Sequence, residues 1–253
     1  MPPLPSSTPL VAKIREFTGH AQPVYNLSPS TRPGFFLSCG SEGLVAEWNI
    51  ATGEARAIVK AQSPIFSMRL LLQRKLLVLG MQSGEVVFAD LGASQPLKRF
   101  LLHKSAIFDA LLLPDGKHLL ISSQDGSISV WNLDKMDYVH QQQVSPASIR
   151  SLVLAPDKMS FLAGSSDQKI RIFDLGLNLL KEWKAHTMSI FRLAFSPYGH
   201  HLVSTGRDAQ IALWDVKNDY KLLHNVPAHM HAVNDLVYPT DSPWLFSGSM
   251  DKS

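Results

Sequence analysis

Short apolar runs alternate with polar, glycine and proline turns along most of the chain. Four such runs follow one another in the middle of the sequence, at residues 107–113, 118–123, 127–133 and 138–142. They are rich in β-branched and aromatic residues, which favour strands. The turns between them include PDG at 114–116 and QDG at 124–126, whose residues preset φ or tolerate a positive one. This pattern predicts a four-stranded antiparallel meander.

The same arrangement recurs at a nearly constant interval. Residues 119–133 (LLISSQDGSISVWNL) are similar to 162–175 (LAGSSDQKIRIFDL) and 202–216 (LVSTGRDAQIALWDV), and residues 36–50 form a fainter copy. Equivalent positions are 41 or 42 residues apart, at Trp48, Ala89, Trp131, Phe173 and Trp214. Helical periodicity is nowhere sustained, so no helices are expected between the strands. Four strands in each period of about 40 residues predict an all-β fold of the propeller type.

Histidine, aspartate and tryptophan motifs keep the same phase as this repeat. They are Gly19-His20 with Trp48-Asn49, Leu102-His103 with Asp125 and Trp131-Asn132, and Ala185-His186 with Asp208 and Trp214-Asp215. The series resembles the WD-repeat β-propeller family over nearly all of the chain after residue 10. A single Trp-Asp pair would be a weak signal, but a phased series is a strong one.

The resemblance implies one propeller domain over residues 11–253, after a disordered tail over residues 1–10. Six blades of four-stranded antiparallel sheet are recognisable, and the last of them is incomplete. Their expected ranges are 18–60, 61–102, 103–143, 144–184, 185–227 and 228–253.

In this family a His, a turn Asp, a strand-two Ser or Thr and the Trp form a buried hydrogen-bonded tetrad. The buried imidazole and indole N–H groups need partners, and an oriented Asp can accept from them. By resemblance the members here are His20, Ser38, Glu42, Trp48, His103, Asp125, Trp131, Asp167, His186, Ser204, Asp208, Trp214, His229, Ser247 and Asp251. Glu42 replaces Asp in the first blade, and its extra methylene is expected to distort that tetrad. The second blade has Gln62, Ser83 and Ala89 at the matching positions and is expected to depend on apolar packing.

The repeat breaks off in the sixth unit. The Trp of that unit would fall six residues after Asp251, but the sequence ends at Ser253. Two readings stay open: the chain is part of a longer protein, or the ring is open. We favour a fragment of a seven-bladed protein of roughly 300 residues. Residues 11–17 (VAKIREF) lie where the WD-repeat family commonly has the strand that closes the ring, and by resemblance we expect this role for them. They cannot complete the sixth unit directly, because its missing third strand would have to lie between.

Each first strand starts with an aliphatic residue that is followed by a larger or more polar one. Side chains alternate across a strand, so the second residue faces away from the packing between the blades. By resemblance this second residue lies near the upper mouth of the central channel. The six residues are Tyr25, Phe66, Phe108, Arg150, Phe191 and Asn234. We expect them to bind a partner there, and the alternative is that the rings only pack between blades.

The residue before each turn Asp is expected to form a rim around this mouth. The rim residues are Ser41, Gln82, Gln124, Ser166, Arg207 and Met250. Aromatic residues with an arginine at a concave centre are typical of binding hot spots. Such a centre is able to seat an arginine, lysine or apolar side chain of a peptide. The predicted function is therefore a non-catalytic scaffold that binds a peptide or protein partner, without a cofactor, on the top face.

The sequence gives no support for an enzyme, a small-molecule binder or a metal site. An enzyme or small-molecule binder at the channel would need one unit with its own cluster of reactive groups, and no such cluster is found. His186, Ser204 and Asp208 have the composition of a hydrolase triad, but the same residue types recur in other units, which favours a structural role. The pairs His200-His201 and His229/His231 lack further ligands at metal spacing, so no metal site is expected.

Composition limits the remaining possibilities. The 24 Lys and Arg residues exceed the 21 Asp and Glu by only +3, so a nucleic-acid partner is not expected. The most apolar stretch, residues 68–80, is interrupted by charged residues and is shorter than the ~20 residues of a membrane helix. A secretory signal is not recognisable, and the single cysteine, Cys39, permits a reducing compartment. We expect a cytoplasmic monomer.

Overall fold

The computed structural model describes residues 12–91, 98–239, 242 and 244–253. The expected tail at residues 1–10 lies outside this part of the chain. Strands of the first two blades are β1 (Val24–Pro29), β2 (Phe35–Gly40), β3 (Leu44–Asn49), β4 (Ala55–Lys60), β5 (Ile65–Leu71), β6 (Leu76–Met81), β7 (Glu85–Asp90) and β8 (Lys98–Leu101). A short 3-10 helix, η1 (Leu72–Arg74), lies between β5 and β6.

The later blades repeat this pattern. Their strands are β9 (Ile107–Leu112), β10 (His118–Ser123), β11 (Ser127–Asn132), β12 (Asp137–Gln143), β13 (Ile149–Leu154), β14 (Ser160–Ser165), β15 (Lys169–Asp174), β16 (Leu179–Lys184), β17 (Ile190–Phe195), β18 (His201–Gly206), β19 (Gln210–Asp215), β20 (Lys221–Pro227), β21 (Val233–Val237) and β22 (Phe246–Ser249). No helix among the described residues has the length and apolar character needed to cross a membrane.

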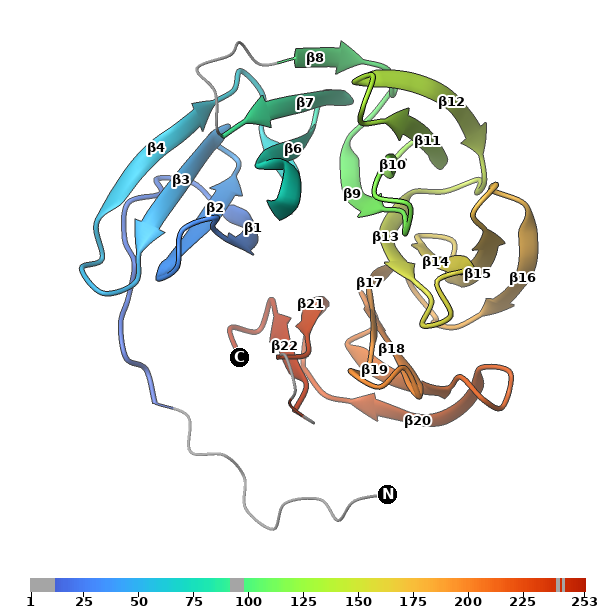
Figure 1. Cartoon of the computed structure of the whole chain (residues 1–253). Coiled ribbons are helices and arrows are strands. Elements are labelled where there is room, and N and C mark those ends of the chain that lie inside the picture. Colours follow the sequence, from blue (N-terminus) through green and yellow to red (C-terminus); the bar gives the residue numbers. More distant parts are fainter. Residues whose placement is uncertain (1–11, 92–97, 240–241, 243) are drawn as a thin grey trace.

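The strands form five four-stranded antiparallel sheets and a sixth sheet of two strands. In each complete sheet the strands follow sequence order from the inner to the outer strand, and the sheets fan around a common centre (Figure 1). Each of the first five predicted blade ranges contains one complete sheet, and the range 228–253 contains β21 and β22. The fold is the predicted all-β propeller.

The apolar core lies between neighbouring blades. Alternate side chains of one strand face opposite neighbours, because successive residues point to opposite sides of a sheet. In β10, Leu119 and Ile121 pack with the second blade, whereas Leu120 packs with the fourth. Cys39 is buried between the first two blades, and burial raises the pKa of its thiol to about 12, so it packs as a neutral group.

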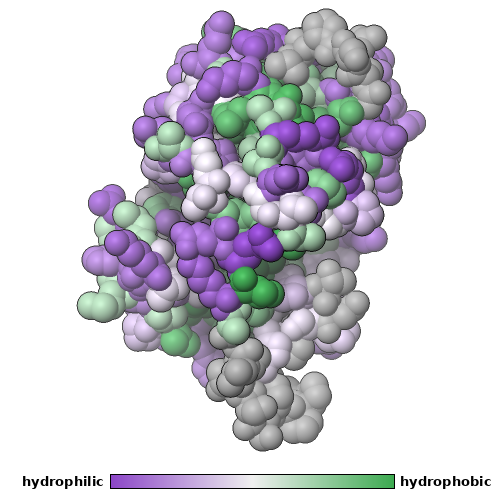
Figure 2. Space-filling view, turned by 90° about the vertical axis from the view of Figure 1, so that its left-hand side faces the viewer, coloured by the Kyte–Doolittle hydropathy of each residue, from purple (hydrophilic) through white to green (hydrophobic). Residues whose placement is uncertain are grey.

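In the described part of the chain, no strand lies between the last blade and the first (Figure 1). Among the described residues, β22 pairs only with β21. Val24 and Leu27 on β1, Val237 on β21 and Phe246 on β22 are exposed. Figure 2 looks from this side and shows hydrophobic residues between hydrophilic ones.

The expected ring-closing strand is not present in the described part of its range, residues 12–17. This segment lies along the first blade instead. The Arg15 guanidinium donates hydrogen bonds to the carbonyls of Ala51 and Thr52 at 2.8 and 3.1 Å, and the ring of Phe17 meets that of Phe36 at 5.0 Å. A closing strand would need a third strand of the last blade as its neighbour, and the sixth sheet has two strands.

Candidate functional site

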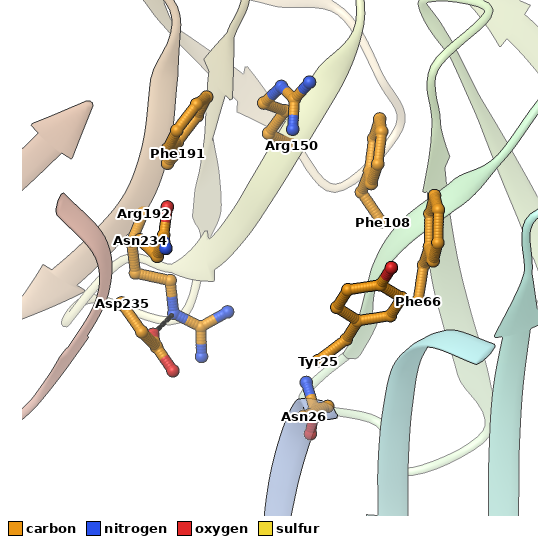
Figure 3. A pocket seen from close by; sticks show the side chains of 9 residues that line it. All are labelled: Tyr25, Asn26, Phe66, Phe108, Arg150, Phe191, Arg192, Asn234 and Asp235. Atoms are coloured by element: carbon orange, nitrogen blue, oxygen red, sulfur yellow. Dashed lines mark ion pairs between the residues drawn. The ribbon is translucent and has the colours of Figure 1, made fainter. Parts of the chain in front are cut away.

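A cavity of about 330 Å³ opens at the centre of the ring, where the inner strands begin. All six residues predicted for the channel mouth line it, as Figure 3 shows: Tyr25, Phe66, Phe108, Arg150, Phe191 and Asn234. They come from the six inner strands β1, β5, β9, β13, β17 and β21. We call this group the mouth.

Each mouth residue occupies the extra position of a β-bulge. In β5, Ile65 pairs with Met81 and Ser67 with Gly80, so Phe66 has no partner across the sheet. The pairing is shifted at the same place in the other five inner strands. A bulge bends the strand and redirects the unpaired side chain. The fold therefore turns the same residue of every blade toward the centre.

Three rings on one side of the mouth form an aromatic cluster, which we define as Tyr25, Phe66 and Phe108. Tyr25 meets Phe66 edge to face at a centroid distance of 5.0 Å. Phe66 and Phe108 are nearly parallel, with a centroid distance of 6.0 Å and an interplanar angle of 7°. All three rings border the cavity and none is fully buried, so apolar surface stays available there.

Arg150 lies between two rings. Its guanidinium carbon is 4.5 Å from the ring centre of Phe108 and 4.8 Å from that of Phe191. Its Nε donates a hydrogen bond of 3.0 Å to the hydroxyl of Ser166. Burial and the nearby positive charge of Arg207 lower the pKa of the Arg150 guanidinium. These contacts hold a cation on the wall of the cavity, between Phe108 and Phe191.

Three further residues line the cavity beside the predicted ones, and sequence reasoning missed them: Asn26, Arg192 and Asp235. Arg192 forms an ion pair with Asp235, with Nε and Oδ1 2.9 Å apart, and a longer one with Asp109, with Nη1 and Oδ2 3.7 Å apart. The available signal was a polar residue directly after each mouth residue. This signal can be interpreted only when the bulge is known. Under strict alternation, the residue after a mouth residue would face the packing between the blades.

The six predicted rim residues share one backbone contact. Each donates its amide to the carbonyl of the residue just before an inner strand, over 2.7 to 3.1 Å. The residues are Ser41, Gln82, Gln124, Ser166, Arg207 and Met250. They therefore lie beside the start of the inner strands but do not line the central cavity. Ser166, through its hydroxyl, and Arg207, through its charge, also act on Arg150.

The fifth blade contains the complete hydrogen-bonded tetrad. His186 Nδ1 lies 3.0 Å from Asp208, and its Nε2 lies 2.8 Å from the hydroxyl of Ser204. That hydroxyl also accepts the indole N–H of Trp214 over 2.8 Å. Burial opposes the charge on Asp208, but the amide of Thr187 and the imidazole of His186 outweigh it and lower the pKa of this carboxyl.

The first blade keeps the same connections although Glu42 replaces Asp. His20 contacts Glu42 through Nδ1 and lies 2.6 Å from the Ser38 hydroxyl through Nε2, and the Trp48 indole donates to Ser38 over 2.7 Å. The expected distortion does not break this network. In the last blade His229 contacts Asp251 and, over 2.8 Å, Ser247.

The third blade takes its hydroxyl from a different strand. His103 Nε2 lies 2.8 Å from Ser129 Oγ, and the Trp131 indole donates to the same atom over 2.9 Å. Ser129 belongs to β11 and pairs directly across the sheet with Ile121 of β10. In the fifth blade the same cross-strand pair is Ser204 with Ala212. The hydroxyl has thus moved to the opposite member of the pair, which the sequence motif did not reveal.

The fourth blade replaces the tetrad by an ion pair. Asp167 was predicted as a tetrad member, but Ser145 stands where the first, third, fifth and sixth blades have His. The guanidinium of Arg171 occupies the interior instead and donates to both carboxylate oxygens of Asp167, over 3.1 Å at Oδ1 and 2.5 Å at Oδ2. Arg171 also pairs with Glu182 over 3.0 Å and is 4% exposed. A buried guanidinium needs such partners to balance its charge.

The described residues contain no group of three or more His, Cys, Asp or Glu side chains that could hold a metal ion. His200 lies in a turn and His201 at the start of β18, and His229 is part of its blade's tetrad. Of these three histidines, His229 makes side-chain hydrogen bonds within its blade.

Comparison with known proteins agrees with the blade structure. The profile of the WD40 family, described as "WD domain, G-beta repeat", matches residues 12–49, 94–132, 138–174, 177–215 and 220–253. The longest unmatched stretch, residues 50–93, contains most of the second blade, where Ala89 stands in the Trp position.

Two similar proteins illustrate this likeness. Pre-mRNA-processing factor 17 of Mus musculus is 31% identical over 71 residues, which cover 28% of this chain and only 12% of that protein. A chain in a crystal structure of the mitotic checkpoint complex has the same fold, with a TM-score of 0.82 and 18% identity, over 93% of this chain and 74% of that one.

Proposed function

The chain belongs to the WD40 repeat family of β-propellers, and on that basis we propose that it is a non-catalytic scaffold whose mouth binds a segment of a partner protein. The observation that carries this proposal is the cavity of about 330 Å³ at the start of the inner strands. Aromatic rings and arginine dominate binding hot spots, because they offer a large contact area with few rotatable bonds. The mouth contains four rings and Arg150.

The alternative role for these rings is packing between blades. Two features favour binding. Most members of the interblade clusters come from the second and third strands of each blade or from other positions of the inner strands. The mouth residues are members of none of these clusters, and Tyr25 is 46% exposed. Rings that do not complete a core are available to a ligand.

A catalytic function at the mouth lacks support from the side chains there. The residues that resemble a hydrolase triad, His186, Ser204 and Asp208, are part of the network that holds the indole of Trp214. The contact between His and Ser recurs in the first and last blades. The acidic residues near the mouth, Asp109 and Asp235, are paired with Arg192. We therefore propose protein binding without a cofactor, in the cytoplasm.

The test compares the proteins that three immobilised forms of the chain capture from a cell extract. The forms are the wild type, the double variant Phe66→Ala/Phe108→Ala, and the control Tyr198→Ala. Tyr198 is 79% exposed in the turn between β17 and β18, at the other end of the blade from the mouth. We expect partners that are retained by the wild type and the control but lost by the double variant, at unchanged circular dichroism.

Equal capture by all three forms would remove the mouth from the binding surface. Should the double variant fail to fold, the single variant Tyr25→Ala replaces it, since Tyr25 is the most exposed ring of the aromatic cluster.

A further inference from the structure

The charges around the mouth are unevenly compensated. Arg192 has two carboxylate partners, Asp109 and Asp235. Among the described residues, no carboxylate forms an ion pair with Arg150 or with Arg207, although the two guanidinium groups influence each other. Of these two arginines, Arg150 lines the cavity.

Arg150 is positioned to receive a ligand. Phe108 and Phe191 cover its two faces, and Nε is used by Ser166, so these contacts fix the plane of the guanidinium. Its terminal nitrogens donate no hydrogen bond to a described residue, and Arg150 lines the cavity (Figure 3). An arginine with a fixed plane and free terminal N–H groups matches the geometry of a carboxylate.

The side of the cavity next to Arg150 is apolar. The aromatic cluster of Tyr25, Phe66 and Phe108 borders it, and the ring of Phe108 also touches Arg150. A ligand therefore meets a positive and an apolar surface that adjoin each other. A lysine or arginine of the partner at the mouth would be repelled by the guanidinium of Arg150, which has no carboxylate partner among the described residues, so such a residue is disfavoured.

We propose that the mouth selects a protein segment in which an Asp or Glu stands beside an aromatic or aliphatic residue. The carboxylate binds the guanidinium of Arg150, and the apolar side chain packs on the aromatic cluster. This inference rests on the proposed function, because it specifies the partner of the same site.

The first experiment selects heptapeptides from a random phage-displayed library on the immobilised wild-type chain. Enriched peptides are then tested on the variant Phe66→Ala/Phe108→Ala. We expect peptides that need the mouth and that carry an acidic residue next to an apolar one. Peptides that need the mouth but carry Lys, Arg or no charge would overturn this inference and leave the proposed function standing. Peptides that bind the variant equally well, or no enrichment at all, would count against both.

The second experiment measures the affinity of one selected peptide by fluorescence anisotropy. Arg150→Gln should weaken binding by about 10-fold, and so should Glu→Gln in the peptide, because each removes a charge-assisted hydrogen bond. The two changes together should cost little more than either alone. The matched control is Arg99→Gln, which removes an exposed arginine of the outer strand β8 and should leave the affinity unchanged.

An affinity of Arg150→Gln within about 2-fold of the wild type would contradict the proposed contact. Added salt should weaken the wild-type complex more than the Arg150→Gln complex, since screening acts on the charge pair. If Arg150→Gln did not fold, the change in the peptide alone would still decide the question.

Discussion

Arg171 shows how one residue can replace the polar core of a blade. In the first, third and fifth blades the matching position holds Ala46, Ser129 or Ala212, and an indole and an imidazole lie nearby. Arg171 fills that place in the fourth blade, where Phe173 stands instead of Trp. Its side chain is 5% exposed, and its charge is balanced by Asp167 and Glu182.

This arrangement predicts a large loss of stability for Arg171→Ala. The change leaves Asp167 without its guanidinium partner in the blade interior, and breaking a buried ion pair on one side costs about 3 kcal/mol. The second variant, Arg171→Leu/Asp167→Asn, removes both charges and should be closer in stability to the wild type. Urea unfolding at pH 7 measures the free energies, and a cost below about 1 kcal/mol for Arg171→Ala would mean that the ion pair is not structural.

The direction of the mouth side chains depends on a bulge in each inner strand, and these strands look regular in sequence. Each first strand starts with an aliphatic residue followed by a mouth residue of another type in nearly every unit. The alternation of side chains along a strand therefore predicted that these two residues face different sides. Alternation did not reveal that the neighbour is an extra residue, which also changes the direction of Arg192 and Asp235. The four strands predicted for the third blade agree with β9 to β12 within one residue at each end, since turn residues stand between them.

In the third blade the shared hydroxyl stands on β11, whereas in the fifth blade it stands on the second strand, β18. Moving the hydroxyl of the third blade to β10 tests whether the two positions are equivalent. Ser129→Ala removes the acceptor shared by His103 and Trp131 and should destabilise the protein by about 1 to 3 kcal/mol. Ile121→Ser alone removes apolar burial and should also destabilise it. The double variant Ile121→Ser/Ser129→Ala recreates the pair Ser204 and Ala212 of the fifth blade.

The double variant should therefore lose less stability than the sum of its two single changes, by about 1 kcal/mol or more. Thermal and urea unfolding of the four proteins give this coupling energy. Strict additivity would show that a hydroxyl on β10 cannot serve His103 and Trp131. In that case the third and fifth blades would be equivalent in backbone structure but not in the positions that can hold the hydroxyl.

The ring as a whole was predictable from its period, because each blade must cover the apolar side of the next. The period also located the second blade, whose polar network is missing and whose strand β6 is buried at every position. The path of residues 12–17 was not predictable in the same way. Whether this segment pairs with the last blade depends on a neighbouring strand rather than on its own composition, and the described segment contacts Ala51 and Phe36.

The polar networks spread over the blades give the whole molecule a pH-dependent stability. Burial lowers the pKa of His103, so the folded protein binds a proton there less readily than the unfolded chain, whose histidine titrates near 6.5. The contribution of His103 to the free energy of unfolding is therefore fully present above pH 6.5 and decreases as the pH falls below it. Hydrogen bonds lower the pKa of Asp125 and Asp208 against the effect of burial, so their contribution persists to about 3.8 and is lost below it.

We therefore expect the urea midpoint to fall in two stages between pH 8 and pH 3, one below about 6.5 and a steeper one below about 3.8. His103→Asn should be less stable at pH 7 but should flatten the first stage, since the unfolded chain then has one fewer site that binds protons more readily than the folded state. His140→Asn, at an exposed position of β12, is the matched control and should keep both stages. A first stage that His103→Asn leaves unchanged would assign it to other groups and would remove His103 as the acid-sensitive point of the ring.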